Sequence, residues 1–160
     1  MLDNNDILRR LRYALNETDQ RCIEIFKLKG RDITQAELRA YMGKPDEDGA
    51  LDCTDELLAL FLDGLIIDRR GPPKNPQGNT ETLLAITNNM VLKKLRIALN
   101  LHENEMLQIL ALGGSNFSRG ELSALFRRPG HKHYRECGDQ VVRNFLKGLT
   151  QRMRPQPESN

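Results

Sequence analysis

A short pattern that occurs twice, 84 positions apart, constrains the fold of this chain more than any other sequence feature. The first copy is Ile33-Thr34-Gln35-Ala36-Glu37-Leu38, and the second is Phe117-Ser118-Arg119-Gly120-Glu121-Leu122. In each copy a hydroxyl side chain is followed three residues later by Glu, which predicts a capping box, and the flanking apolar residues predict a hydrophobic staple. Carried outward without a gap, the match extends from residues 4/88 to residues 65/149. The chain is therefore an internal duplication.

Apolar residues at helical spacing predict four helices in each copy. We expect them near residues 4–15, 18–29, 35–42 and 54–68, and again near residues 89–99, 103–112, 119–127 and 138–152. Asn4 is expected to cap the first helix and Asn16 to end it, since Asn tolerates the left-handed conformation. A unit of this size buries too little surface alone. The predicted fold is all-α, with two tandem pseudo-symmetric repeats of about four helices packed into one body.

Composition divides the chain into four segments. Residues 1–70 form the first repeat, and residues 71–86 form a Pro/Gly-rich linker that we expect to be exposed and mobile. Residues 87–154 form the second repeat, and residues 155–160 form a polar tail that we expect to be disordered. Both repeats are expected to build their cores from eight identical pairs at core spacing: Leu8/Leu92, Leu11/Leu95, Leu15/Leu99, Leu28/Leu112, Leu38/Leu122, Phe61/Phe145, Leu62/Leu146 and Leu65/Leu149.

The fourth predicted helix is apolar almost all round, which is typical of a helix in a protein interior. Three of its apolar residues stand where the second repeat has Asn144, Thr150 and Gln151. These three are Leu60, Ile66 and Ile67. We expect them to form an interface, either between the repeats or between chains.

The two repeats carry opposite net charge. Residues 1–70 contain 11 Lys/Arg against 15 Asp/Glu, whereas residues 85–154 contain 12 against 5. Basic side chains can bind the phosphates of DNA or RNA, and neighbouring His and Tyr can hydrogen-bond or stack on bases. The candidates for binding a nucleic acid or an acidic partner are Lys93, Lys94, Arg127, Arg128, His131, Lys132, His133, Tyr134 and Arg135. Arg143 and Lys147 on the last predicted helix could also contact phosphates if they share a face with these residues. Alternatively, these residues form a solvated face or pair with acidic residues of this or a neighbouring molecule. Arg96 corresponds to Arg12 and is expected to be structural.

No constellation of residues predicts catalysis or a metal site. His131, His133 and Cys137 lie within seven residues of one another, but their spacing is not that of a zinc site. The acidic stretch from Asp46 to Asp52 lacks the glycine and the bidentate glutamate of a calcium loop, which favours a solvated acidic loop. We therefore predict no catalytic residue, no metal and no cofactor.

Cys53 and Cys137 occupy corresponding positions before a predicted helix. Glu56 or Gln140 follows three residues later, in an arrangement that resembles a capping box. A thiol at a helix N-terminus can have a lowered pKa and be reactive. Retention in both copies favours the alternative, a small buried residue that fills the turn.

The ends and the cysteines indicate a soluble cytoplasmic protein. The first residues include neither a basic segment nor an apolar run, and no stretch of about 18 apolar residues occurs. Three scattered cysteines are too few for a disulfide framework, which agrees with a reducing compartment.

Three stretches carry a resemblance to a known family: Asn5-Asp6-Ile7-Leu8-Arg9, residues 88–98 and residues 135–140, followed by Phe145-Leu146-x-Gly148-Leu149. With them, nearly the whole chain resembles the bacterial YehS family, also called domain of unknown function 1456. The resemblance implies a cytoplasmic bacterial protein whose biochemical role is unassigned. It supplies no catalytic residues to carry over.

The sequence thus predicts a non-enzymatic binding or regulatory module. The leading hypothesis is protein association, including self-association, because the charge asymmetry and the apolar surplus both favour it. The alternative is DNA or RNA binding by the basic second repeat. We expect no membrane partner and no small-molecule substrate.

Overall fold

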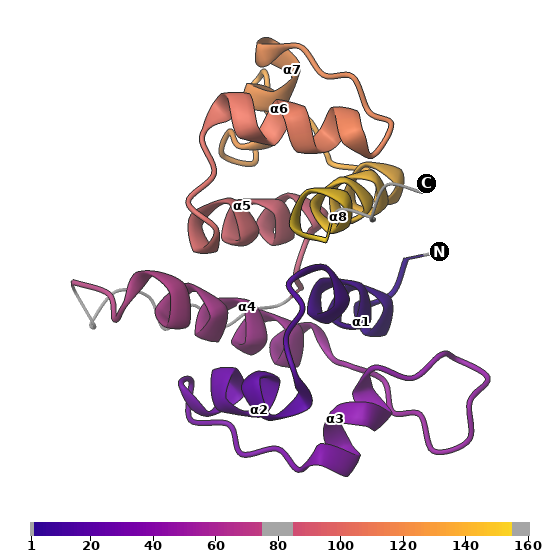
Figure 1. Ribbon diagram of the computed structural model, residues 1–160. Helices are drawn as coiled ribbons and strands as arrows, with labels where there is room; N and C mark the ends of the chain where they lie inside the picture. The colour runs from indigo at the N-terminus through magenta and orange to yellow at the C-terminus, as the bar shows by residue number, and fades with distance from the viewer. Residues whose placement is uncertain (1, 75–84, 155–160) are drawn as a thin grey trace, which may run out of the picture.

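The structure is a computed structural model that describes residues 2–74 and 85–154. These residues form eight helices and no strand: α1 (Asn4–Ala14), α2 (Asp19–Lys27), α3 (Gln35–Tyr41), α4 (Asp55–Arg70), α5 (Asn88–Ala98), α6 (Glu103–Leu112), α7 (Arg119–Leu125) and α8 (Asp139–Met153). Figure 1 shows their arrangement. The predicted all-α fold is confirmed. Most of the predicted linker, residues 75–84, and the whole predicted tail lie outside the described residues.

The two predicted capping boxes are present. The Thr34 hydroxyl accepts from the backbone N–H of Glu37 at 3.1 Å, and the Glu37 carboxylate accepts from the N–H of Thr34 at 3.0 Å. Ser118 and Glu121 make the same two bonds, each at 3.1 Å. The predicted starts of α3 and α7 are therefore confirmed.

Two other cap predictions are wrong. Asp3 caps α1, so Asn4 is its first helical residue. Thr54 caps α4 with a hydrogen bond to Leu57 N, one residue later than the arrangement predicted at Cys53. The end of α1 agrees with prediction, because Asn16 adopts φ 55°, as does its counterpart Asn100 at 52°.

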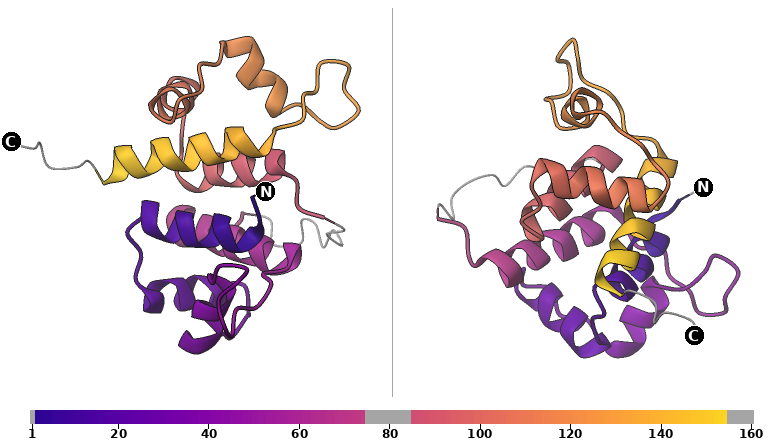
Figure 2. Two further views of the ribbon diagram at one scale, coloured as in Figure 1. Left: turned by 90° about the vertical axis from the view of Figure 1, so that its right-hand side faces the viewer. Right: turned by 45° about the horizontal axis from the view of Figure 1, so that its top comes forward.

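Four helices, α1, α4, α5 and α8, form the centre of the molecule, with α2 and α3 outside at one end and α6 and α7 at the other (Figures 1 and 2). Each repeat packs its first helix against the fourth helix of the other, α1 on α8 and α5 on α4. The Leu2 N–H donates to Asp139 at 3.4 Å near the start of α8, and Arg154 donates to the Tyr13 carbonyl at 3.1 Å near its end. Since both starts and both ends meet, α1 and α8 run in the same direction.

Corresponding aspartates tie the repeats together at these two junctions. Asp55 accepts from the Asn4 amide at 2.7 Å within its own repeat and from the N–H of Ile86, the residue just before the second repeat, at 3.0 Å. Asp139 accepts in the same way from Asn88 at 2.9 Å and from the Leu2 N–H. The bond from Asn88, followed by that from Leu2, holds the pKa of Asp139 below its ordinary value. The contacts repeat at the 84-residue offset, so the two junctions are pseudo-equivalent.

The hydrophobic core agrees with the predicted pairs in all but one case. Seven of the eight pairs are buried or packed against the core, including Phe61 and Phe145, which are fully buried. The prediction is wrong for Leu28 and Leu112, because these side chains are 46% and 49% exposed. Leu28 is the C-cap residue of α2 and Leu112 is the last residue of α6, so both stand at the final turn of an outer helix.

The outer helices approach the central helices very closely at two corresponding glycines. Gly64 on α4 lies against the backbone carbonyl of Ile25 on α2, and Gly148 on α8 lies against that of Ile109 on α6. A Cβ atom at either glycine would overlap the facing carbonyl oxygen. Absence of a side chain therefore sets the distance between these helices.

Two buried asparagines hold the turn that precedes the fourth helix of each repeat. Asn5 donates to the carbonyls of Gly43 at 3.1 Å and Leu51 at 2.8 Å, and it accepts from the Cys53 N–H at 2.7 Å. Asn89 donates to the carbonyls of Leu125 at 2.9 Å and Arg135 at 2.8 Å, and it accepts from the Cys137 N–H at 2.9 Å. These are the buried polar residues of the described chain. Each asparagine side chain forms hydrogen bonds with three backbone groups that are remote from it in sequence.

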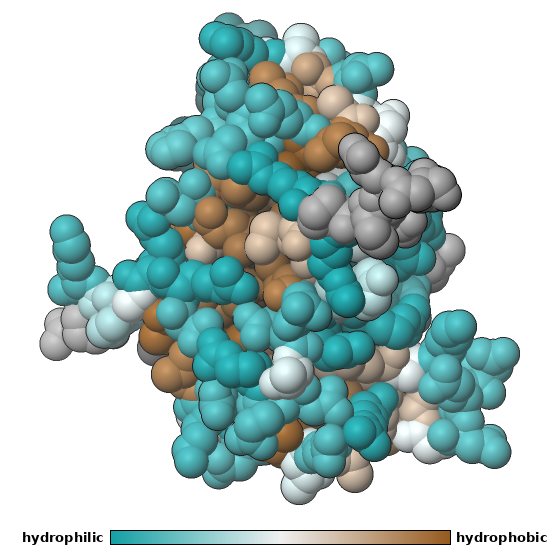
Figure 3. Space-filling view, viewed as in Figure 1, coloured by the Kyte–Doolittle hydropathy of each residue, from teal (hydrophilic) through white to brown (hydrophobic). Residues whose placement is uncertain are grey.

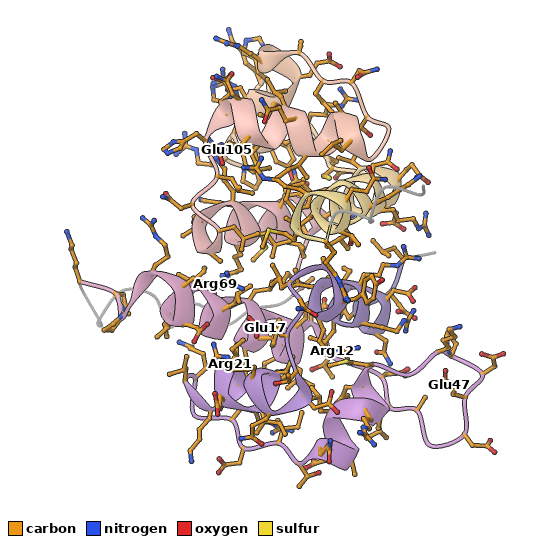
Figure 4. The ribbon with its side chains drawn as sticks, in the orientation of Figure 1. Arg12, Glu17, Arg21, Glu47, Arg69 and Glu105 are labelled. Atoms are coloured by element: carbon orange, nitrogen blue, oxygen red, sulfur yellow. The ribbon has the colours of Figure 1, made fainter. Side chains whose placement is uncertain are left out.

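Acidic side chains of the first repeat pair mostly within that repeat. Glu17 accepts from Arg69 at 3.0 Å and faces Arg21 at 3.6 Å, and Figure 4 shows the three side chains close together. Arg21 also pairs with Asp68 at 2.7 Å, which links α2 to α4. Among the described residues, Lys94–Asp63 is the ion pair that joins the two repeats, at 2.5 Å. The basic half is therefore largely unneutralised by the acidic half.

No helix in residues 2–74 and 85–154 combines the length and the apolar character needed to cross a membrane.

Candidate functional site

The structure brings together four of the nine predicted basic-site residues. Lys93 from α5 faces the segment after α7, which supplies Arg127, Arg128 and Tyr134. Together with Met90 and Phe126 they line a concavity of about 320 Å³. Four of the predicted residues therefore line one concave surface that carries three cations.

The other predicted residues have different surroundings. Lys94 is committed to Asp63 across the α4–α5 junction, and Arg135 pairs with Glu121 at 3.3 Å while lying over the ring of Phe117. Lys132 is exposed. Lys94 and Arg135 are therefore partly neutralised by carboxylates of this chain.

His131 and His133 lie beside each other in the segment before α8. Their ring centres are 5.6 Å apart, and the His131 Nδ1 atom accepts from the His133 N–H at 3.0 Å. Within residues 2–74 and 85–154, no three His, Cys, Asp or Glu side chains come close enough to hold a metal ion. The acidic segment that includes Glu47 extends away from the helices (Figure 4), and its acids are exposed.

Cys53 and Cys137 are packing residues. Each side chain is 6% exposed, and burial raises the pKa of each thiol to about 12. A thiol with this pKa stays protonated near neutral pH and is a poor nucleophile. The interpretation that these cysteines fill the turn is confirmed.

A larger cavity lies elsewhere, in a groove between α1 and α8. It has a volume of about 650 Å³, and Figure 2 (left) shows its two helices side by side. Five of its eleven lining residues are Arg or Lys, and none is Asp or Glu. The α1–α8 groove is lined by Arg9, Arg10, Arg12, Tyr13, Gln140, Arg143, Asn144, Leu146, Lys147, Thr150 and Gln151.

The five cations of the α1–α8 groove differ in what they already bind. Arg9 pairs with Asp6 and donates to the Met42 carbonyl at 2.8 Å. Arg12 donates to the Glu17 carbonyl at 3.1 Å, as its counterpart Arg96 does to that of Leu101, so the structural role predicted for this pair is confirmed.

The remaining three cations, Arg10, Arg143 and Lys147, form no ion pair with any carboxylate of the described residues. Asp139, one turn before Arg143, already accepts from Asn88 and Leu2. The groove therefore presents positive charge that other residues of the described chain leave largely uncompensated. It can bind an anion without breaking an existing ion pair.

The sequence analysis included Arg143 and Lys147 among the possible phosphate contacts, but it missed the groove because the other wall comes from the first repeat. Arg9 and Arg10 belong to the repeat whose overall charge is acidic, and Arg143 and Lys147 lie more than 130 residues further along the chain. Only the packing of α1 on α8 brings them together. The available signal was that α1 carries three arginines and a single acid, Asp6.

The α4–α5 junction, pseudo-equivalent to the groove, carries apolar residues at positions where the groove is polar. Leu60, Ile66 and Ile67 occupy the positions that correspond to Asn144, Thr150 and Gln151 of the α1–α8 groove. Ile66 packs against the core, while Leu60 and Ile67 are half-buried on α4. Ile97, the counterpart of Tyr13, is 43% exposed on α5. Figure 3 shows hydrophobic surface over α4 and α5, so the two junctions have diverged into a basic and an apolar one.

The fold defines the class as an all-α protein built from two tandem repeats that share a central core. The chain belongs to the family described as protein of unknown function (DUF1456), whose model matches residues 4–71 and 88–154, once for each repeat. It is 40% identical over 149 residues to the uncharacterized protein YehS of Escherichia coli (strain K12), covering 93% of this chain and 95% of that protein. No solved structure matches the chain. The family resemblance predicted from the sequence is confirmed.

Proposed function

We propose that the protein is a non-enzymatic binding module that holds nucleic acid in the α1–α8 groove. The observation that carries the proposal is the lining of this groove, with five Arg or Lys side chains and no carboxylate. Concave surfaces of one charge sign focus the electric field and attract oppositely charged polymers. Lys and Arg side chains that bind phosphates release the counterions condensed on the nucleic acid. Several cations of the groove could contribute to this release at once.

Lining chemistry supports a nucleic acid rather than an apolar peptide. Apart from Leu146, the residues between the cations are mainly amide and hydroxyl side chains, which can hydrogen-bond to phosphate, sugar or base. The concavity around Lys93, Arg127 and Arg128 offers further phosphate contacts on the second repeat. The groove contains no carboxylate, histidine or cysteine among its lining residues, which favours binding over proton-transfer chemistry.

The proposal also places the protein in the cytoplasm, where nucleic acid is accessible. All three cysteines of the chain are free and buried, which is typical of proteins in a reducing compartment.

The test is fluorescence anisotropy of the full chain with a labelled 20-nucleotide DNA of mixed sequence, single-stranded and duplex, at low and high salt. Arg10→Gln combined with Arg143→Gln is expected to weaken binding by about tenfold, because two phosphate contacts are lost, and to reduce the salt dependence. The matched control is Lys27→Gln combined with Lys29→Gln, which removes the same charge from exposed positions on and after α2 and should leave affinity nearly unchanged.

Two results would count against this assignment. Absence of binding by the unaltered chain at low salt would reject nucleic-acid binding altogether. Loss of binding in a variant with Arg127→Glu, Arg128→Glu and Lys132→Glu, while the Arg10/Arg143 variant binds normally, would move the site to the second repeat, as the sequence had suggested.

A second candidate function, protein association, has its own structural support. Leu60 and Ile67 are half-buried on α4 and Ile97 is exposed on α5, and Lys94 and Asp63 form an ion pair between the same two helices. A neutral, apolar surface of this kind favours contact with another protein surface, including that of a second copy.

Light scattering at low and high salt tests this candidate. We expect a dimer that persists at high salt, because burial of apolar surface is not screened by ions. Leu60→Asn combined with Ile67→Gln introduces the residues of the second repeat at the same positions and should shift the chain toward monomer. A strict monomer in both salts would argue against self-association.

A further inference from the structure

The α1–α8 groove contains an aromatic side chain in addition to its cations. Tyr13 lines the groove and is 51% exposed. Its counterpart in the other repeat is Ile97, so the aromatic ring occurs at the basic junction and not at the apolar one. An exposed aromatic beside unpaired cations is the combination that single-stranded nucleic acids use, with bases stacked on rings and phosphates held by Lys and Arg.

The Tyr13 ring is held in place from one side. The guanidinium carbon of Arg154 lies 4.1 Å from the ring centre, and an Arg154 N–H donates to the Tyr13 carbonyl at 3.1 Å. One face of the ring is thus covered by the guanidinium, while half of the side chain remains accessible. A planar base can stack on the accessible part and extend the guanidinium–ring stack.

The basic side chains of the groove follow one another along its length. Arg143 and Lys147 are one helical turn apart on α8, a rise of about 6 Å. Arg10 lies across the groove on α1. This arrangement can contact successive phosphates of a strand that runs along the groove.

We propose that the α1–α8 groove binds single-stranded nucleic acid in preference to duplex, with a base stacked on Tyr13 and the backbone held by Arg10, Arg143 and Lys147. This inference rests on the proposed function and specifies its substrate class. A duplex keeps its bases paired inside and its phosphates outside, so it can contact the cations but cannot stack a base on the ring. Inorganic polyphosphate supplies charge without any base.

The experiment uses Tyr13→Trp in the full chain. Because the natural sequence contains no tryptophan, the new indole is the sole tryptophan signal and reports on this position alone. We expect oligo(dT) to quench its fluorescence, whereas a duplex of equal charge and inorganic polyphosphate leave it nearly unchanged. In parallel anisotropy measurements, Tyr13→Ala should weaken oligo(dT) binding by about tenfold, and Tyr13→Phe should retain it.

The outcomes separate this inference from the proposed function. If oligo(dT) and duplex bind equally and Tyr13→Ala changes neither, the groove binds nucleic acid through phosphates alone and the stacking inference is overturned. If neither nucleic acid binds, both proposals fail, and binding of polyglutamate in their place would identify an acidic protein partner. A thermal unfolding curve of Tyr13→Ala that matches the unaltered chain shows that a loss of binding is not a loss of fold.

Discussion

Gly148→Ala is expected to lower the free energy of unfolding by about 4 kcal/mol, even though alanine favours helix by about 1 kcal/mol over glycine. The new methyl group would overlap the carbonyl oxygen of Ile109 on α6, and it would also crowd the backbone N–H of Gly113. Both neighbours are backbone atoms, so no side-chain rotation can make room. The helices α6 and α8 must therefore move apart, which breaks packing along the whole contact.

Urea denaturation followed by circular dichroism measures the effect of Gly148→Ala as a lower midpoint with an unchanged slope. Gly120→Ala in α7 is the matched control, because the nearest atom to its added methyl group is 4.0 Å away. This variant should be neutral or stabilised by up to about 1 kcal/mol. A Gly148→Ala protein as stable as the control would contradict the close approach of α6 to α8.

Asn89→Ala is expected to cost about 3 kcal/mol of stability. It removes the partner of two carbonyls and one N–H at once, and burial leaves these backbone groups without full access to water. The turn that leads into α8 then loses its connection to α5. Because α8 forms one wall of the groove, the same variant should also weaken nucleic-acid binding.

The comparison for Asn89→Ala is Asn104→Ala, an exposed asparagine in α6 whose loss should change stability by less than about 0.5 kcal/mol. Asn89→Asp gives a second check, since it keeps the acceptor for Cys137 but replaces the amide donor with an oxygen that faces two carbonyls. At pH 7 its loss should be at least as large as that of Asn89→Ala. A tolerated Asn89→Asp would indicate that the site needs only a side chain of this size.

Local sequence patterns predicted the features of this protein that depend on neighbouring residues. The hydroxyl and carboxylate of Thr34 and Glu37 are three positions apart, so their capping box forms whenever that turn forms. The left-handed Asn16 ends α1 for an equally local reason. Helical periodicity located the core residues of each repeat, such as Leu8 and Phe61, because amphipathic helices bury their apolar face.

Predictions from local sequence patterns were wrong where the position of a residue in the tertiary structure decides its burial or its ion-pair partner. Leu28 and Leu112 have core spacing, but they stand at the last turn of α2 and α6, and both side chains are about half exposed. Lys94 was grouped with the basic candidates, yet it faces Asp63 on the neighbouring repeat. Four of the predicted candidates do lie together, in the concavity after α7: Lys93, Arg127, Arg128 and Tyr134.

By itself, the sequence determined the duplication, the all-α class and the eight helices of the described chain, since propensity, capping and periodicity act over a few residues. Only the tertiary structure decided that each first helix packs on the fourth helix of the other repeat. That exchange brings Arg10 into one groove with Arg143 and Lys147, across more than 130 positions of sequence, and makes the α1–α8 junction basic. Electrostatic interaction depends on distance in space, which a linear pattern does not contain.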